Sequence, residues 1–186
     1  MKKLVVISIV LLSVMSIFAV SLSDEELNGI LQMREEEKLA RDVYLELYDI
    51  WGLKTFYNIA QSEQTHMDRV GYLIDLYNLQ DPALEERGEF TNEDLQALYE
   101  KLITQGSASL IDAIKVGMLI EELDIKDLLE LMETTNNEDL LTVYEALENG
   151  SENHLRAFNR QLEKFSATYE YQYISEELAK EILSGK

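Results

Sequence analysis

The sequence of 186 residues contains no cysteine, a single proline and eight glycines. Without cysteine the chain can form neither a disulfide nor a lipid-modified cysteine anchor, and histidine is its only nitrogen or sulfur side chain typical of metal sites. Because proline and glycine are the residues that interrupt helices, their scarcity favours long, continuous helices. Strand-like alternation of Val, Ile and Thr is also missing. The sequence therefore predicts an all-α protein.

Basic residues are few: 16 Lys and Arg stand against 36 Asp and Glu, which gives a formal net charge of −20. A field of that sign repels phosphate backbones, so we expect no nucleic-acid partner. It attracts cations, although acidity alone is weak evidence for a metal site. Most of these carboxylates are expected to lie on solvated helix faces.

The first residues differ in character from all that follows. A short basic start at residues 1–3 precedes an apolar run over residues 4–20, and Ala19-Val20-Ser21 fits a small-x-small cleavage site. Residues 1–21 are therefore predicted to be a signal peptide, and the protein is expected to be secreted or periplasmic. The alternative is an uncleaved membrane anchor, because an apolar run of this length reaches the lower limit for spanning a bilayer.

Helix start and stop signals divide residues 22–186, which are predicted to form one domain. Ser23 to Glu26 has the form of a capping box and Trp51-Gly52 a stop, and a second capping box is predicted at Thr135 to Glu138. The signals predict four long helices, over about residues 23–51, 54–78, 107–133 (with residue 109 as an alternative start) and 135–166. A connection of roughly 25 residues with its own short helix separates the two pairs, and a short helix follows residue 175. This order favours a four-helix bundle with a crossover connection, with an irregular helical array as the alternative.

The chain has only two histidines, and both lie on predicted inward faces. His66 closes the sequence Glu63-Gln64-Thr65-His66, and a spacing of three residues places Glu63 and His66 side by side on one helix face. His154 lies on the apolar side of the last long helix. Three residues before it, where a second carboxylate would complete the same motif, stands Ser151.

Helical phase adds further carboxylates to this set. Glu37 falls in register with the apolar stripe of the first helix, Glu121 with that of the third long helix, and Asp124 at its edge. Other carboxylates turn away from the stripes. Glu35, Glu36 and Glu152 are expected in solvent, and Glu122 is a weaker ligand candidate than Glu121.

Burying an unpaired carboxylate costs several kcal/mol, so a cluster drawn from four helices is best explained by a cation. Two inward glutamates plus Glu-x-x-His motifs form the ligand scheme of di-iron and di-manganese bundles. The predicted ligands of one or two iron ions, with manganese as a further candidate, are Glu37, Glu63, His66, Glu121 and His154. The alternative is a metal-free network in which carboxylates hold imidazolium groups.

Three segments resemble known proteins: residues 33–44, Glu63 to His66, and Gly150 to Phe158. The first resembles the first-helix ligand region of rubrerythrins. Together the three resemble a bacterial and archaeal family of unknown function in the ferritin-like group, the DUF2202 family, over about residues 22–183. The resemblance implies a ferritin-like bundle with iron ligands at Glu37, Glu63, His66 and Glu121.

The resemblance also implies a range of functions. We expect an exported protein that binds iron or another transition metal and, if it is an enzyme, oxidises ferrous iron or reduces oxygen or peroxide. Any reductant must come from elsewhere, because a chain without cysteine has no rubredoxin-like relay. The alternative is a structural or partner-binding helical protein with a metal-free polar core. Fold analogy by itself establishes no reaction.

Overall fold

The computed structural model describes residues 21–185, which contain six helices and no strand. The helices are α1 (Asp24–Trp51), α2 (Lys54–Leu76), α3 (Glu93–Gly106), α4 (Leu110–Thr134), α5 (Glu138–Lys164) and α6 (Glu176–Ser184). The prediction of an all-α protein is confirmed. Of the predicted signal peptide, residues 1–20 lie outside the described residues. Within residues 21–185, no helix combines the length and the apolar character needed to cross a membrane.

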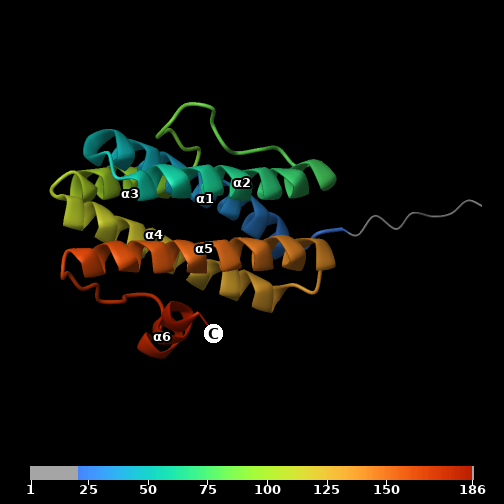
Figure 1. The fold of residues 1–186 in the computed structure, drawn as a ribbon. Helices are drawn as coiled ribbons and strands as arrows, with labels where there is room; N and C mark the ends of the chain where they lie inside the picture. The colour runs from blue at the N-terminus through green and yellow to red at the C-terminus, as the bar shows by residue number, and fades with distance from the viewer. Residues whose placement is uncertain (1–20, 186) are drawn as a thin grey trace, which may run out of the picture.

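The four long helices lie side by side (Figure 1), with α1 packed on α2 and α4, and α5 packed on α4 and α2. Neighbouring helices are antiparallel, because α1 and α5 run in one direction while α2 and α4 run in the other. The chain must therefore travel back along the molecule between α2 and α4, and residues 77–109, including α3, make this return. The α6 helix packs on the outer side of α5.

The ends of α1 follow the signals in the sequence. The Ser23 hydroxyl accepts the backbone N–H of Glu26, and the Glu26 carboxylate accepts the backbone N–H of Ser23, which is a complete capping box. Gly52 ends the helix with a φ of 66°, a left-handed conformation that favours glycine.

The start of α5 differs from the prediction. Asn137, and not Thr135, is the N-cap, and its side chain accepts the backbone N–H of Asp139. The Thr135 hydroxyl instead accepts the backbone N–H of Asn137 and donates to Glu26 at 2.6 Å. The predicted capping box at Thr135 is therefore wrong by two residues, because Thr135 joins this loop to the first turn of α1.

Two apolar clusters fill the interior on either side of a polar layer. One contains the mutually packed rings of Tyr44, Phe56 and Phe158, with centroids 5.2–6.1 Å apart. The other is built from aliphatic residues around Ile30 and Leu140. On α1, α2 and α5 the two clusters leave a gap of several residues near the middle of the helix, and the polar residues of the site occupy it.

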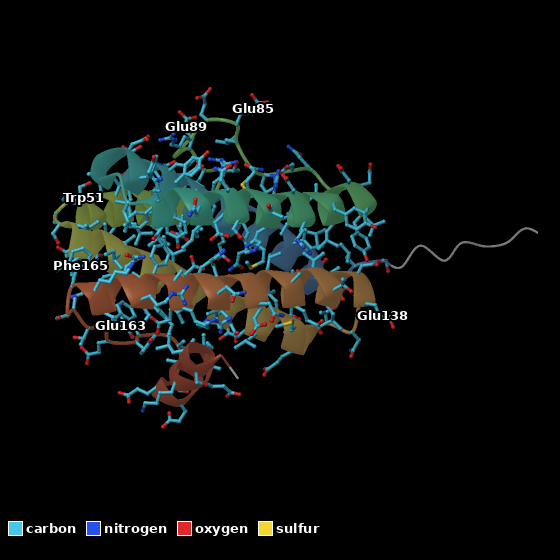
Figure 2. All side chains as sticks on the ribbon, viewed as in Figure 1. Trp51, Glu85, Glu89, Glu138, Glu163 and Phe165 are labelled. Atoms are coloured by element: carbon cyan, nitrogen blue, oxygen red, sulfur yellow. The ribbon has the colours of Figure 1, made fainter. Side chains whose placement is uncertain are left out.

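Most acidic side chains project into solvent, as expected. Figure 2 shows this for Glu85 and Glu89 in the connection after α2, and for Glu138 and Glu163 near the two ends of α5. In the same view, side chains fill the space between α2 and α5.

Three glutamates that helical phase assigns to solvent, or rotates away from the core, are instead buried in whole or part. Glu35 is buried and accepts the backbone N–H groups of Thr91 and Asn92 at the start of α3. Glu122 is fully buried beneath residues 169–174. Glu36 is half-buried, and its Oε2 atom is enclosed. These glutamates are buried because α1 and α4 are covered on a second face by segments distant in the sequence.

Candidate metal centre

Five side chains predicted to act together meet in the gap between the two apolar clusters. They come from the middle of all four long helices and are at most 7% exposed: Glu37, Glu63, His66, Glu121 and His154. Helical phase therefore identified the residues that share this interior. Whether they bind a metal is a separate question, and it depends on their geometry.

The Glu63 carboxylate lies at the centre of the cluster, between the two imidazoles. His66 Nδ1 is 2.8 Å from Glu63 Oε2, and His154 Nδ1 is 2.9 Å from Glu63 Oε1. The two rings are stacked, with centroids 5.4 Å apart and an interplanar angle of 27°. Both Nδ1 atoms therefore lie close to the same carboxylate, although they come from α2 and α5.

A second pair of carboxylates flanks the imidazoles. Glu37 Oε2 is 3.1 Å from His66 Nδ1, and Glu121 Oε2 is 3.3 Å from His154 Nδ1. The Tyr44 hydroxyl donates to the other oxygen of Glu121. This hydrogen bond orients the Glu121 carboxylate, so that Oε2 faces the cluster.

Short distances in this cluster do not mean satisfied hydrogen bonds. Both oxygens of Glu63 and the Nδ1 atom of His154 have no hydrogen-bond partner of suitable direction among residues 21–185. The same holds for Glu37 Oε1 and Glu121 Oε2. A buried polar atom without a partner costs about 1–3 kcal/mol, and more when it is charged. His66 Nδ1 and Glu37 Oε2 are hydrogen-bonded, whereas the unpartnered atoms converge on a common space, as ligands around an ion do.

Three of these residues meet the geometric requirement for a shared ion. Glu63, His66 and His154 each offer one ligand atom, and these atoms all lie within 4.8 Å of one another. The group can therefore hold a metal ion. Imidazole nitrogen and carboxylate oxygen together suit iron, manganese or zinc.

The charges of the cluster shift its pKa values strongly. Burial by itself would raise the pKa of Glu63, but the positive imidazoles of His154 and His66 outweigh it and lower that pKa to about 2. Burial by itself would lower the pKa values of the histidines, but the carboxylates raise them to about 10 for His66 and about 11 for His154. Burial raises the pKa of Glu37 to about 8 and that of Glu121 to about 7. A metal ion entering this centre must displace protons from the imidazoles.

Ser151 occupies the position where a second Glu-x-x-His motif would have its glutamate. It is buried, and its hydroxyl donates to the Leu147 carbonyl oxygen of its own helix at 3.3 Å.

Asp124 of α4 is the additional buried carboxylate near the cluster, and its Oδ2 atom has no hydrogen-bond partner within the described part of the chain. Burial, followed by repulsion from Glu37, Glu121 and Glu63, raises the pKa of Asp124 well above its ordinary value. The sequence placed Asp124 at the edge of the stripe, whereas the structure buries it.

Gly150 is a residue of the site that helical phase does not identify. A Cβ atom at this position would lie 2.3 Å from His66 Nε2, so the backbone of α5 passes directly against the imidazole of α2. Any side chain at position 150 would displace the ring. The signal in the sequence is a glycine in the middle of a helix, where it is about 1 kcal/mol less favourable than alanine.

Comparisons with known proteins identify a family and a similar protein with a solved structure. The sequence profile of DUF2202, described as an uncharacterized protein domain, matches residues 26–186. The chain is 52% identical over 165 residues to the uncharacterized protein MJ0754 of Methanocaldococcus jannaschii. The aligned residues make up 88% of this chain and 89% of that protein. The crystal structure of hypothetical protein MJ0754 superimposes with a TM-score of 0.88 at 51% identity, covering 89% of this chain and 95% of the other. The chain therefore belongs to the DUF2202 family.

Proposed function

We propose that this protein is an exported, ferritin-like four-helix bundle that binds iron, or another transition metal such as manganese, between its helices. One observation carries the proposal. Glu63, His66 and His154 converge within 4.8 Å in a buried space, and the oxygens of Glu63 have no hydrogen-bond partner among the described residues. A cation at this position would satisfy atoms that the described chain leaves unsatisfied.

The arrangement of the helices supports the ferritin-like part of the proposal. In ferritin-like di-metal proteins, two helices each supply one glutamate and two supply Glu-x-x-His, and a long crossover links the helix pairs. Here Glu37 and Glu121 come from α1 and α4, and Glu63 with His66 from α2. The α5 helix supplies His154 with Ser151 in place of glutamate, so the set favours one well-ligated ion, with solvent completing a second.

Iron bound in this centre would supply one-electron chemistry with oxygen or peroxide, so we propose ferrous iron oxidation or oxygen or peroxide reduction as the activity. The residues of the chain have separate roles. Tyr44 orients Glu121, the apolar clusters exclude bulk water, and the imidazoles release the protons that metal binding displaces. Ferrous iron is the electron donor in its own oxidation, whereas sustained reduction of oxygen or peroxide needs a reductant supplied from outside this chain.

Metal loading of protein purified without a histidine tag tests the proposal. After anaerobic incubation with ferrous iron or Mn²⁺ and removal of free metal, we expect about one retained equivalent by elemental analysis. The melting temperature should rise, because a ligand that binds only the folded state at about 100 times its Kd stabilises it by about 2.7 kcal/mol. Retention of less than a tenth of an equivalent with an unchanged melting temperature would contradict the proposal.

The short imidazole–carboxylate distances favour one alternative, a metal-free polar core in a structural or partner-binding protein. The double variant Glu63→Ala, His154→Ala separates the two functions. Metal binding should be abolished if the centre is a metal site, whereas a purely structural network predicts lower stability in a protein that never bound metal.

Export is proposed from residues 1–21 and has its own test. The intact mass of the protein from cells that produce it naturally should lack about the first 21 residues. A full-length mass in the membrane fraction would instead support an uncleaved anchor.

A further inference from the structure

A small cavity lies between α1, α3 and α4, on the outer side of the metal centre. Its volume is about 110 Å³, and five apolar side chains line it together with three carboxylates, Glu36, Asp124 and Asp127. Apolar walls around several carboxylates are an unfavourable arrangement unless something neutralises the charges. One water molecule occupies about 30 Å³ of liquid volume, so a cavity of this size has room for only a few water molecules.

Two of the three carboxylates are half-buried, and the third is buried. The side chain of Asp127 is 21% exposed, Glu36 is half-buried, and Asp124 is 4% exposed. Neighbouring members are close enough to repel one another, since Glu36 interacts with Asp127 and Asp124 with Glu36. At the inner end Asp124 also interacts with Glu37 and with the other carboxylates of the centre. Together they form a continuous acidic series from the surface to the centre.

Two oxygens in this series are unpartnered. Glu36 Oε2 and Asp124 Oδ2 are buried and find no hydrogen-bond partner within residues 21–185. An unpartnered carboxylate oxygen in a cavity of this size selects for a small cation or a water molecule, and it excludes anions and large organic molecules.

We propose that this cavity is the path by which a divalent cation reaches the metal centre, with Asp127, Glu36 and Asp124 as successive transit ligands. The proposal rests on the proposed metal-binding function. A carboxylate-lined path with low-dielectric walls concentrates cations and raises their rate of entry by about 10–10³-fold.

Lys126 stands at the outer end of this path. Its Nζ atom lies 2.9 Å from Asp127 Oδ1 and 2.8 Å from Glu130 Oε2. Because the lysine ammonium pairs with Asp127, it competes with an entering cation for that carboxylate and slows entry.

The rate of loading tests the path. Metal-free protein is mixed anaerobically with ferrous iron, and unbound iron is trapped with a colorimetric chelator at successive times. Glu36→Gln should load at least about tenfold more slowly than wild type, and Lys126→Met should load faster. Both should reach the wild-type number of bound ions. The matched control Glu145→Gln removes one exposed charge from α5 and should load at the wild-type rate.

A second variant tests the path without changing a charge. Leu98→Trp adds bulk to the half-buried wall of the cavity and should slow loading, whereas Leu84→Trp in the exposed connection should not. This variant decides the question if Glu36→Gln fails to fold.

The outcomes separate this proposal from the proposed function. If wild-type protein retains no metal, the proposed function fails. If wild type loads and both Glu36→Gln and Leu98→Trp load at its rate, the path is wrong and the metal enters elsewhere. If Glu36→Gln instead lowers the final number of bound ions, Glu36 is a resident ligand and the transit role is overturned.

Discussion

Two regions of this protein bury charged side chains, and they differ in whether those side chains have hydrogen-bond partners. Outside the centre, Lys38 and Asp42 are fully buried, and both oxygens of Asp42 accept hydrogen bonds, from Lys38, Arg41 and the Gly88 backbone. Lys38 also donates to a backbone carbonyl and lies 4.5 Å above the ring of Phe90. Every charge in this region has a partner from the chain itself.

Glu122 follows the same pattern. One oxygen accepts the backbone N–H groups of residues 172–174, and the other accepts the hydroxyl of Tyr169. In the centre, by contrast, Glu37, Glu63, Glu121 and Asp124 all have oxygens without partners among the described residues. This chain can therefore satisfy buried carboxylates with its own groups. Where it leaves several unsatisfied together, an external cation is the consistent explanation.

The greatest change in stability from a single substitution is expected around Lys38 and Asp42, where every buried charge has a partner. Lys38→Met should lower the free energy of unfolding by about 3 kcal/mol, because breaking a buried pair leaves an uncompensated buried charge. Urea unfolding measures this loss, and retained metal per chain should stay at the wild-type value. Lys180→Met, which breaks an ion pair whose side chains are more than 70% exposed, serves as the control with almost no change. If Lys38→Met abolished metal binding, the two regions would not be independent.

The free energy of unfolding of the metal-free protein should depend on pH, because burial and mutual interaction shift the pKa values of the centre. Glu37 and Glu121 have folded pKa values of about 8 and 7, above their ordinary 4.5, so their contribution to stability is full below pH 4.5 and is lost as pH rises to 7–8. The raised pKa values of His66 and His154 extend this loss above pH 6.5, toward 10–11. Glu63 has the opposite sign, and its lowered pKa costs stability only as pH falls from 4.5 toward 2.

Stability of the metal-free protein should therefore fall by several kcal/mol between pH 5 and pH 8. Chemical unfolding at a series of pH values measures the decline, and Glu37→Gln with Glu121→Gln should flatten it. Metal affinity should rise over the same range, because protons leave the imidazoles. An equal slope in wild type and the double variant would assign the decline to the two histidines and to surface charge instead.

Gly150→Ala tests the close approach between α5 and His66. The added Cβ overpacks the site, which typically costs about 1–3 kcal/mol, and it displaces the imidazole. Metal affinity should fall by about tenfold, as measured by competition with a chelator of known affinity. The matched control is Gly71→Ala on α2, where the nearest atom belongs to the flexible Arg34 side chain at 3.5 Å. Equal affinities of the two variants would show that His66 has no role in metal binding.

The smallest expected effect is a gain in stability. Asp124→Asn replaces a buried, repelled carboxylate by a neutral group of the same shape, and it should stabilise the metal-free protein at pH 8 by about 1 kcal/mol. Thermal unfolding at pH 8 detects this gain, with the exposed Asp75→Asn as the control. The same change should slow metal loading, so that stability and function move in opposite directions. A loss of stability would mean that Asp124 serves the structure in its ionised form.

The fold was predictable where the signals are local. Ser23 and Gly52 mark the ends of α1 through contacts within a few residues, and the structure has both. The start of α5 was not predictable in this way, because both Thr135 and Asn137 can cap a helix. The choice depends on the hydrogen bond from Thr135 to Glu26, which is distant in the sequence. The assignment of Glu122 failed for a similar reason, since its partners lie some 50 residues later.

The candidate site was largely predictable because helical phase depends only on spacing. One apolar stripe on each helix identified Glu37, Glu121 and the two histidines as neighbours, and they meet in the structure. Phase cannot give the distances between helices, so it did not reveal that α5 touches His66 at Gly150. It also cannot tell which buried oxygens lack partners, and this is the observation that favours a metal.

Anomalous diffraction from crystals of the iron-loaded protein tests the central claim most directly. Data collected on both sides of the iron absorption edge should give a difference peak between Glu63, His66 and His154, within about 2.3 Å of a carboxylate oxygen and an imidazole nitrogen. Metal-loaded Glu63→Gln crystals should lose that peak. Well-ordered side chains at this position with no anomalous peak, in crystals whose solution contains excess ferrous iron, would contradict a metal centre in this protein.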